Sequence, residues 1–407
     1  MNLLVATEER FSLTHTGMIC GDGPVKYPNW ATCLEVFDRV TVLARVGVSQ
    51  RAWPEETRAD GPSVSFCALP DYRGPWQYLR TLPELKVLVR QAVLQSEAYI
   101  LRVPGLVGRL AWREITRLRR PYALEVVSDP WDALGPGTWP SVFRPVFRRV
   151  GTSELKAMCK GATAVHYVTQ AALQDRYPPG KDSYAVGYCY SDISTLAAFA
   201  SSQTMAERHR RVEERTIQGS NHGKTFRVGF IGTLALMYKG PDVLLRAVAL
   251  CRERGLDLEV ELAGEGRCLE AMKQLASRLG IADRTRFAGQ LPFGTPILDF
   301  LDSVDLFVMP SRHEGLPRAM IEAMSRGCPC IGSRVGGIPE LLNADDIVPA
   351  GDADALAEKI LEVADAPQRL KQMSERNLEK ARQFSPEAST EARRTFLRQV
   401  RLRSTRP

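Results

Sequence analysis

The sequence of 407 residues is poor in the features that assign some protein classes at a glance. It has no run close to the roughly 18 uncharged apolar residues that a membrane-spanning helix needs. Its start, MNLLVATEERF, holds at most five apolar residues in a row before Glu8 and Glu9. A signal peptide instead begins with basic residues and has a longer apolar core. We therefore expect a cytoplasmic protein without a transmembrane segment.

Thiol and metal-binding patterns are also missing. The nine cysteines are an odd number scattered from Cys20 to Cys330, and none forms a C-x-x-C pair, so buried free thiols are expected rather than a disulfide framework or a zinc ribbon. The five histidines are dispersed. Asp352 and Asp354 form a D-x-D sequence, but it opens a helical pattern, where an aspartate typically caps the helix. The sequence predicts no metal site and no bound cofactor.

A basic segment stands out among the features that are present. The chain carries a formal net charge of +7, and residues 73–120 alone hold ten basic and three acidic side chains, interleaved with apolar ones. Such a segment is suited to lie on an anionic membrane, here on its inner face. The alternative is an ordinary pair of helices with a solvated basic face. Nucleic acid is not an expected partner, because no recognisable binding motif accompanies the charge.

Short apolar runs alternate with helical patterns along both halves of the chain. We expect strands at 3–6, 40–44, 98–103, 122–127 and 164–168 in the first half, and at 227–231, 258–262, 284–288, 306–309 and 329–332 in the second. Continuous apolar strands separated by helices indicate parallel sheets covered by helices on both faces. The sequence therefore predicts an α/β protein with two doubly wound, Rossmann-like domains.

A polar segment separates the two halves. Residues 201–225 have the pattern of a charged helix followed by a stretch rich in Gly, Asn and Ser, which favours a linker. We place an N-terminal domain at 1–200, the linker at 201–225, a C-terminal domain at 226–385 and a basic helix at 386–407. Open α/β sheets bind ligands where their strands end, beside helix N-termini, so we expect a ligand in a cleft between the domains.

The strongest chemical motif runs from Glu314 to Glu322. It follows the expected strand 306–309 and enters a helix, so Glu314 would lie on a loop and Glu322 inside the helix. Two glutamates near a helix start are by themselves typical of ordinary surface charge. Here they stand with Met309-Pro310-Ser311 before them, Ala323-Met324 after them, and a Gly-Gly-Ile-Pro-Glu run that ends at Glu340.

Together these residues make the segment resemble the family-4 glycosyltransferases, a retaining class with the GT-B fold. The resemblance covers about residues 227–385 well and the N-terminal half more weakly. It implies two domains that face each other across a cleft, with a C-terminal helix that returns to the N-terminal domain. It also implies that the C-terminal half binds a nucleotide-sugar donor, UDP- or GDP-linked, and that the N-terminal half binds the acceptor.

The resemblance assigns roles within this motif. Glu314 would contact the donor sugar and take part in catalysis, and Glu322 would bind the ribose hydroxyls. Both roles suit carboxylates, which accept hydrogen bonds from vicinal hydroxyls and help to balance positive charge at an anomeric carbon. The diphosphate would face the helix N-terminus, with donor-binding positions at Gly315, Leu316, Pro317 and Arg318. We expect backbone groups near Gly289 to recognise the base.

A second motif, from Gly232 to Gly240, follows the expected strand 227–231. Relatives carry an arginine just after the glycine and a lysine six positions further on, and both bind the diphosphate. Here Lys239 is present and is the second catalytic candidate, but Thr233 stands in place of the arginine. A hydroxyl still bonds a phosphate oxygen, though without the assistance of a charge. Arg312 and Arg318 are the candidates to compensate.

Acceptor-side assignments come from the N-terminal half. Gly17, with His15 beside it, stands where relatives have a glycine-rich loop near phosphate and acceptor, although His15 is equally well interpreted as an exposed loop histidine. Ser128 stands where many relatives have a histidine near the donor sugar. Asp129, which follows it, is the third catalytic candidate.

The sequence thus favours a retaining, metal-independent glycosyltransferase of the hexosyltransferase type, acting in cell-surface polysaccharide synthesis on a glycan or lipid-linked acceptor. Two other functions stay open. A nucleotide-sugar epimerase would have the same architecture, although the spacing of Glu314 and Glu322 favours transfer. A non-catalytic glycan-assembly partner would keep the fold, and Thr233 and Ser128 are its only support.

Overall fold

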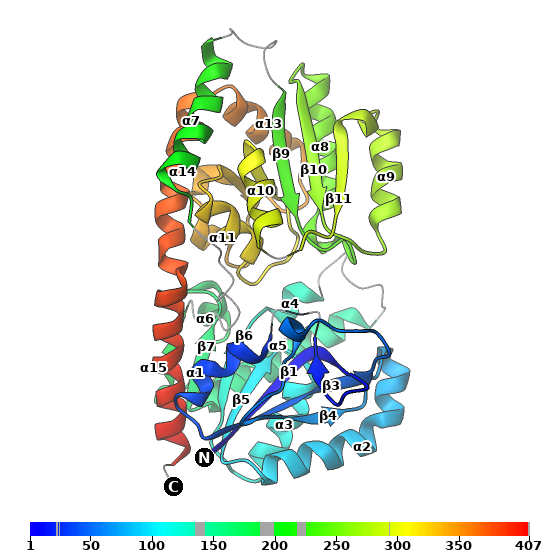
Figure 1. The fold of residues 1–407 in the computed structure, drawn as a ribbon, viewed down its shortest axis with the longest axis vertical. Coiled ribbons are helices and arrows are strands. Elements are labelled where there is room, and N and C mark those ends of the chain that lie inside the picture. Colours follow the sequence, from blue (N-terminus) through cyan, green and yellow to red (C-terminus); the bar gives the residue numbers. More distant parts are fainter. Residues whose placement is uncertain are drawn as a thin grey trace. The chain divides into compact units, whose positions relative to one another are not determined.

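The computed structural model describes residues 1–21, 23, 25–134, 143–187, 199–217, 225–292 and 294–405. The chain divides into two compact units. The N-terminal unit comprises Met1–Pro130, Arg149–Ser194 and Glu387–Pro407, and the C-terminal unit comprises Trp131–Arg148 and Thr195–Pro386. Each unit contains a parallel sheet with helices, which confirms the prediction of two Rossmann-like domains (Figure 1).

The sheet of the N-terminal unit has the strand order β4-β3-β1-β5-β6-β7-β8, with every neighbouring pair parallel. Its strands are β1 (Asn2–Leu13), β3 (Arg39–Val48), β4 (Val64–Leu69), β5 (Ala98–Val103), β6 (Ala123–Val126), β7 (Ala164–Tyr167) and β8 (Tyr184–Val186). A two-residue strand, β2 (Ile19–Cys20), pairs antiparallel with β1. The five expected strands are all present.

The first strand is longer than its apolar run indicates. We expected it to end at Ala6, but β1 continues to Leu13 after a register shift between Ala6 and Arg10. Polar side chains in this extension are held by neighbours: Arg45 Nη2 donates to Glu8 O over 2.8 Å, and Arg10 Nη2 donates to Tyr72 O over 2.8 Å. These contacts allow polar residues to continue a strand that apolar pattern alone would end.

The N-terminal unit is covered by long helices from distant parts of the chain. They are α2 (Gly74–Leu94), α3 (Leu106–Arg117) and α15 (Pro386–Ser404), joined by the short helices α1 (Ala31–Leu34) and α6 (Ala172–Arg176). Helix α15 buries Phe396 and Leu397 in the core of this unit. Its Arg393 donates to Glu125 Oε1 on β6 over 2.8 Å, and both side chains are buried. The predicted return of the C-terminal helix to the N-terminal unit is confirmed.

The sheet of the C-terminal unit has the order β11-β10-β9-β12-β13-β14 and is parallel throughout. Its strands are β9 (Phe226–Ile231), β10 (Leu258–Ala263), β11 (Thr285–Gly289), β12 (Leu306–Met309), β13 (Cys330–Ser333) and β14 (Ile347–Val348). Its helices are α8 (Pro241–Glu253), α9 (Leu269–Arg278), α10 (Thr295–Ser303), α11 (Arg318–Ser325), α12 (Ile338–Leu341), α13 (Ala353–Ala364) and α14 (Pro367–Ala381). Asp352 caps α13 by accepting from Ala355 N over 2.9 Å, as predicted for the D-x-D sequence.

Two helices span the positions in the sequence at which the chain passes from one unit to the other. Helix α4 (Pro130–Ala133) and helix α5 (Arg144–Gly161) follow β6. Within the expected linker, residues 202–217 form helix α7 (Ser202–Ile217), whose Arg208 is 2% exposed and donates to Val304 O and Leu301 O of the C-terminal unit. Residues 218–224 of the expected linker lie outside the described residues. Within the described part of the chain, no helix combines the length and apolar character needed to cross a membrane.

Candidate functional site

The loops that follow the strands of the C-terminal unit carry the two sequence motifs. The segment 232–240 follows β9, the segment 264–268 follows β10, and the segment 310–317 follows β12. Because the strands are parallel, their carboxyl ends lie at one edge of the sheet, and these loops meet there (Figure 1). The two motifs, far apart in the sequence, are therefore brought together.

A direct ion pair joins the two motifs. Lys239 Nζ lies 2.8 Å from Oε1 and 3.0 Å from Oε2 of Glu314. Ser311 Oγ donates to the same Oε1 over 2.7 Å. The side chains of Lys239 and Glu314 are 17% and 6% exposed, so the pair is largely shielded from water. A carboxylate and an ammonium at such short distance form a charge-assisted hydrogen bond, which is stronger than a neutral one.

The surroundings keep Lys239 charged. Burial acts to lower the pKa of Lys239, but the Glu314 carboxylate, with help from Tyr238, outweighs it and raises this pKa above its ordinary value. The ammonium also lies 5.3 Å from the centre of the Tyr238 ring, within the range of a cation–π contact. The site therefore presents a fixed positive charge beside a carboxylate.

The loops that carry the pair are locked to each other. Arg312 forms a two-pronged salt bridge with Asp242, with both N–O distances at 2.7 Å, and also donates to Met237 O over 2.9 Å. Gly240 has a φ of +71°, and a Cβ there would lie 2.1 Å from Pro310 O, so only glycine fits. Arg312, a candidate to replace the missing arginine, thus serves to hold the two loops in place.

The second glutamate lies on helix α11. Arg318 Nη2 is 3.8 Å from Glu322 Oε1, a loose contact between the first and second turns of the helix. Burial raises the pKa of Glu322, and the nearby Arg318 opposes part of this effect. Pro317 occupies the N-cap position of the helix without a capping side-chain hydrogen bond, and Leu316 before it is 5% exposed. Arg318, the second candidate to compensate for the missing arginine, therefore lies next to the Glu322 carboxylate.

Close backbone packing shapes the loop around Glu314. Gly337 N donates to Gly315 O over 2.6 Å. Gly336 has a φ of +51°, and a Cβ on it would lie 2.2 Å from Glu314 O. Gly336 of the Gly-Gly pair noted in the sequence is thus required for the Glu314 loop to lie against the loop that follows β13.

The loops after β9, β10 and β11 pack backbone against backbone. Gly264 N donates to Gly289 O over 2.7 Å, and a Cβ on Gly264 would lie 1.9 Å from Gly232 O. Thr233 is exposed, and its hydroxyl accepts from Ala235 N over 3.2 Å. Arg267, which the sequence analysis did not single out, donates to Ala235 O over 2.8 Å. Gly232, Thr233 and Gly289 therefore share one edge with the ion pair.

The acceptor-side candidates occupy two different loops of the N-terminal unit. Asp129 follows β6, is buried, and accepts hydrogen bonds from Arg176 and the Tyr177 hydroxyl. Ser128 beside it is partly exposed. His15 and Gly17 are exposed in the turn between β1 and β2, where Gly17 N donates to Thr14 O over 3.1 Å. Burial and the Asp129 carboxylate raise the pKa of Tyr177, so this hydroxyl is a donor at neutral pH.

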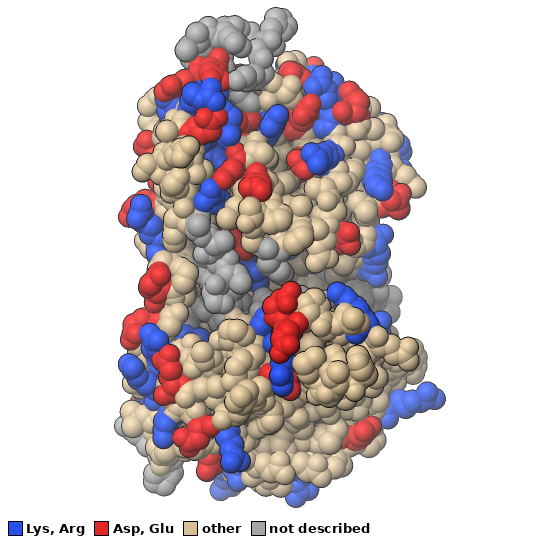
Figure 2. Space-filling model, in the orientation of Figure 1, with Lys and Arg blue, Asp and Glu red and all other residues tan. Residues whose placement is uncertain are grey.

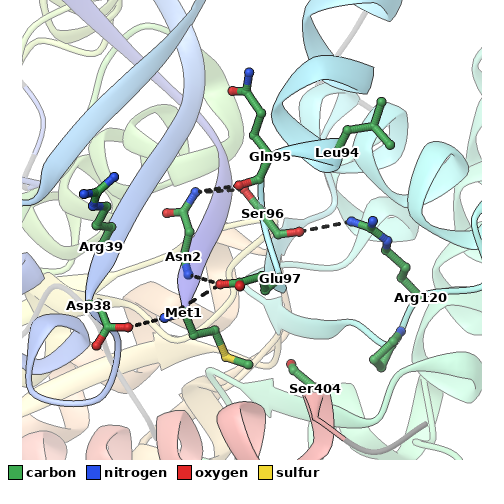
Figure 3. A pocket seen from close by; sticks show the side chains of 11 residues that line it. Met1, Asn2, Asp38, Arg39, Leu94, Gln95, Ser96, Glu97, Arg120 and Ser404 are labelled. Carbon is green, nitrogen blue, oxygen red and sulfur yellow. Dashed lines mark hydrogen bonds and ion pairs between the residues drawn. The ribbon is translucent and has the colours of Figure 1, made fainter.

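A large cavity of the N-terminal unit lies at the opposite edge of its sheet (Figure 3). It has a volume of about 700 Å³, and its lining includes Asn2, which begins β1, and residues 94–97, which precede β5. Its polar groups already bond to one another: Asn2 N donates to Glu97 Oε2 over 2.6 Å, and Arg120 donates to Ser96 O over 3.0 Å. Across the described residues, no cluster of three or more His, Cys, Asp or Glu side chains is arranged to hold a metal ion.

Comparison with known proteins places this architecture among characterised families. Residues 225–366 match the family model described as Glycosyl transferases group 1. The chain is 32% identical over 381 residues to a D-inositol 3-phosphate glycosyltransferase of Segniliparus rotundus, covering 86% of this chain and 80% of the relative. It is 23% identical over 334 residues to Protein CapJ of Staphylococcus aureus, covering 81% of this chain and 78% of the relative.

A solved structure shows the same fold. The crystal structure of HepE of Anabaena in complex with UDP superimposes with a TM-score of 0.64 at 18% sequence identity. The match covers 96% of this chain and 98% of the other.

Proposed function

The chain belongs to the glycosyl transferases group 1 family and is a glycosyltransferase with the GT-B fold; from this premise we propose that it transfers a sugar from a nucleotide-sugar donor with retention of anomeric configuration. The observation that carries the proposal is the shielded pair of Lys239 and Glu314, 2.8 Å apart at the carboxyl edge of the C-terminal sheet. A nucleotide diphosphate needs a cation, and its sugar needs an acceptor of hydrogen bonds. A single nucleotide-sugar molecule would therefore contact both Lys239 and Glu314.

Lys239 would bind the diphosphate and Glu314 the sugar. In the structure these two groups neutralise each other, so a bound diphosphate would compete with Glu314 for Nζ. The N–H groups at the start of α11 add a positive partial charge on the same edge. Glu322 would accept from the ribose hydroxyls. The binding of UDP by the Anabaena neighbour supports a UDP-linked donor, and a GDP-linked donor stays within the proposal.

The reaction we infer breaks the bond between the anomeric carbon and the diphosphate oxygen. The acceptor oxygen forms its bond to that carbon from the same face, and the departing phosphate oxygen takes the acceptor proton. Glu314 stabilises positive charge at the carbon without forming a covalent bond. Lys239 stabilises the negative charge that develops on the leaving group. No step requires a metal ion, so the proposal includes metal-independent transfer.

On the acceptor side the proposal assigns Ser128 and Asp129, with His15 and Gly17 as further contacts. The Asp129 carboxylate accepts from two side chains, Arg176 and Tyr177, so it is better suited to position a neighbouring group than to remove a proton. We propose a glycan or lipid-linked glycan as acceptor, in cell-surface polysaccharide synthesis at the inner membrane face. The exposed basic side chains that helices α2 and α3 carry within residues 73–120 support this choice.

A second candidate acceptor is a small polyol phosphate. The similarity to a D-inositol 3-phosphate glycosyltransferase over most of both chains favours it. With this acceptor, the donor and the proposed reaction stay the same, and only the molecule that the N-terminal unit binds is different.

A coupled assay tests the proposal. The purified protein is first screened by thermal shift against UDP- and GDP-sugars, because a ligand that binds only the folded state raises the melting temperature. With a stabilising donor, release of nucleoside diphosphate is then measured with lipid-linked glycans or inositol phosphate as acceptor. Release that depends on acceptor supports transfer. Interconversion of the donor sugar without release would indicate an epimerase, and binding without any turnover would indicate a non-catalytic partner.

A further inference from the structure

Helix α2 exposes a continuous outward face to solvent. At about 100° per residue, Trp76, Leu79, Arg80, Pro83, Lys86, Val87, Arg90 and Leu94 fall within an arc of roughly 120°. All eight are exposed. Trp76 is 82% exposed, and Leu79 and Val87 are 56% and 55% exposed. The opposite side of the helix buries Leu85, Val89, Ala92 and Val93, so α2 is anchored to the unit while this outward face stays free.

The charge on this face has one sign. Arg80, Lys86 and Arg90 lie among the apolar side chains, and none of the eight residues is acidic. Within the described part of the chain, neither Arg80 nor Lys86 forms an ion pair. Arg90 does form one, with its Nε 3.6 Å from Glu114 Oε1 on α3. Helix α3 adds the exposed Arg113 and Arg117, which form ion pairs with Glu154 and Glu114. Figure 2 shows several basic side chains, together with acidic ones, along the lower border of the N-terminal unit, where Figure 1 draws α2.

This combination distinguishes the face from an ordinary surface helix. Single exposed apolar residues are common on soluble proteins, but here a tryptophan and three aliphatic residues share one stripe with three cations. A helix with an apolar stripe, basic residues beside it and a tryptophan is suited to lie in the headgroup region of a bilayer. A second copy of the chain is a poor match, because a two-fold contact of this face with itself would bring its set of three cations, Arg80, Lys86 and Arg90, against the same set on the other copy.

The face also lies where a membrane-bound substrate would be useful. Helix α2 begins just after β4, so its first turns, with Trp76 and Leu79, are at the carboxyl edge of the N-terminal sheet. Ligands of open α/β sheets bind at that edge. A bilayer touching this part of α2 would hold the N-terminal unit with its ligand edge close to the membrane surface.

We propose that the outward face of α2 docks the protein on an anionic lipid bilayer. Trp76, Leu79, Val87 and Leu94 enter the interface between headgroups and acyl chains, and Arg80, Lys86 and Arg90 bind anionic headgroups. The inference rests on the proposed function only in explaining why a bilayer is useful, namely that it carries the acceptor. The docking itself depends on α2 alone.

Flotation of the full-length protein with vesicles tests this. The vesicles are phosphatidylcholine alone or phosphatidylcholine with 30 mol% phosphatidylglycerol, at low and high salt. The wild type should float with the anionic vesicles at low salt, less at high salt, and little with the neutral ones. Arg80→Gln with Lys86→Gln should weaken the binding constant about thirtyfold, since each neutralised cation removes one headgroup contact. Trp76→Ser with Leu79→Ser should abolish flotation.

Matched controls come from α15, where Arg398 and Leu402 are exposed. Arg398→Gln and Leu402→Ser should float like the wild type. The inference is overturned if the wild type ignores anionic vesicles, if the α2 variants float unchanged, or if the controls lose as much as the α2 variants. It is equally overturned if Trp76→Ser converts a stable dimer to a monomer, because a second copy would then cover the face. Nucleotide-sugar binding, measured on the same variants, should be unchanged; its absence in the wild type would instead refute the proposed function and leave the docking result standing.

Discussion

Lys239 on the loop after β9 and Glu314 on the loop after β12 form a shielded ion pair, with the ammonium 2.8 Å and 3.0 Å from the two carboxylate oxygens. Neither residue has another recorded partner of opposite charge in the part of the chain that the structure describes. Each charge therefore depends on the other, and removing either leaves an uncompensated charge.

Glu314→Gln should abolish sugar transfer while the fold persists, because the amide keeps the shape of the side chain but not its charge. Loss of at least about a hundredfold in kcat is expected from the removal of a charge that stabilises the transition state. Acceptor-dependent release of nucleoside diphosphate measures it. Glu358→Gln, at an exposed position on α13, is the matched control and should retain wild-type turnover. Wild-type turnover by Glu314→Gln would contradict the assigned role.

Single removal of either partner should also cost stability. Lys239→Met leaves the Glu314 carboxylate buried with Ser311 as its remaining recorded donor, and the free energy of unfolding should fall by about 3 kcal/mol. The double variant Lys239→Met with Glu314→Leu should recover most of this loss, because no buried charge is left unpaired. Denaturant unfolding of the singles and the double completes the cycle. Additive losses would show that the two groups are not coupled.

The pH dependence of stability should carry the signature of Glu322. Because burial raises the pKa of this carboxyl above its ordinary value of 4.5, the native state binds more protons than the unfolded state just above pH 4.5. The contribution of Glu322 to stability is therefore present at lower pH and is lost as the pH rises through the folded pKa. Glu322→Gln should raise the melting temperature at pH 7 relative to wild type, yet weaken donor binding. A lower melting temperature at pH 7 would contradict this account.

Thr233→Arg tests the missing charge in the first motif. An arginine at this exposed position would place a second cation beside the proposed diphosphate site, and the dissociation constant for UDP should fall about tenfold. Ser277→Arg, exposed on α9, adds the same charge elsewhere and should leave UDP affinity unchanged. Equal effects of the two substitutions would mean that only net charge matters.

Helix α15 provides a stability test in the N-terminal unit. Arg393 and Glu125 are both buried and bond over 2.8 Å, so Arg393→Ala should lower the free energy of unfolding by about 3–5 kcal/mol. Arg398→Ala, with a side chain 65% exposed on the same helix, should change it little. A similar loss for both would indicate that helix propensity, and not the buried pair, sets the effect.

The sequence predicts those parts of the fold in which one local pattern, such as a continuous apolar run, decides the secondary structure. Buried parallel strands such as β5 and β12 are continuous apolar runs, and the sequence located both. Strand β4 was missed because it lies at the edge of its sheet, where exposed Ser65 interrupts the apolar pattern. The extension of β1 was missed because its polar residues are satisfied by distant partners such as Arg45, which the local sequence does not reveal.

In the candidate site, too, some features are predictable from the sequence and others are not. The spacing of Glu314 and Lys239 relative to their strands was enough to place both at one sheet edge. The pairing of Arg312 with Asp242, over 70 positions, was not predictable, and it removes Arg312 as a replacement for the missing arginine. The sequence predicts only a charged helix at the start of residues 201–225, and it does not single out Arg208, which is buried and donates to backbone oxygens of the C-terminal unit. In the sequence alone, a charged residue that forms internal structural bonds cannot be distinguished from a charged residue on the surface.

Titration calorimetry of UDP into wild type and Lys239→Ala measures the central claim most directly, since Lys239 is assigned to the diphosphate itself. The wild type should bind one UDP per chain, and the variant should bind at least about tenfold more weakly or not at all. Equal affinity of the two proteins for UDP would place the diphosphate elsewhere and contradict the account.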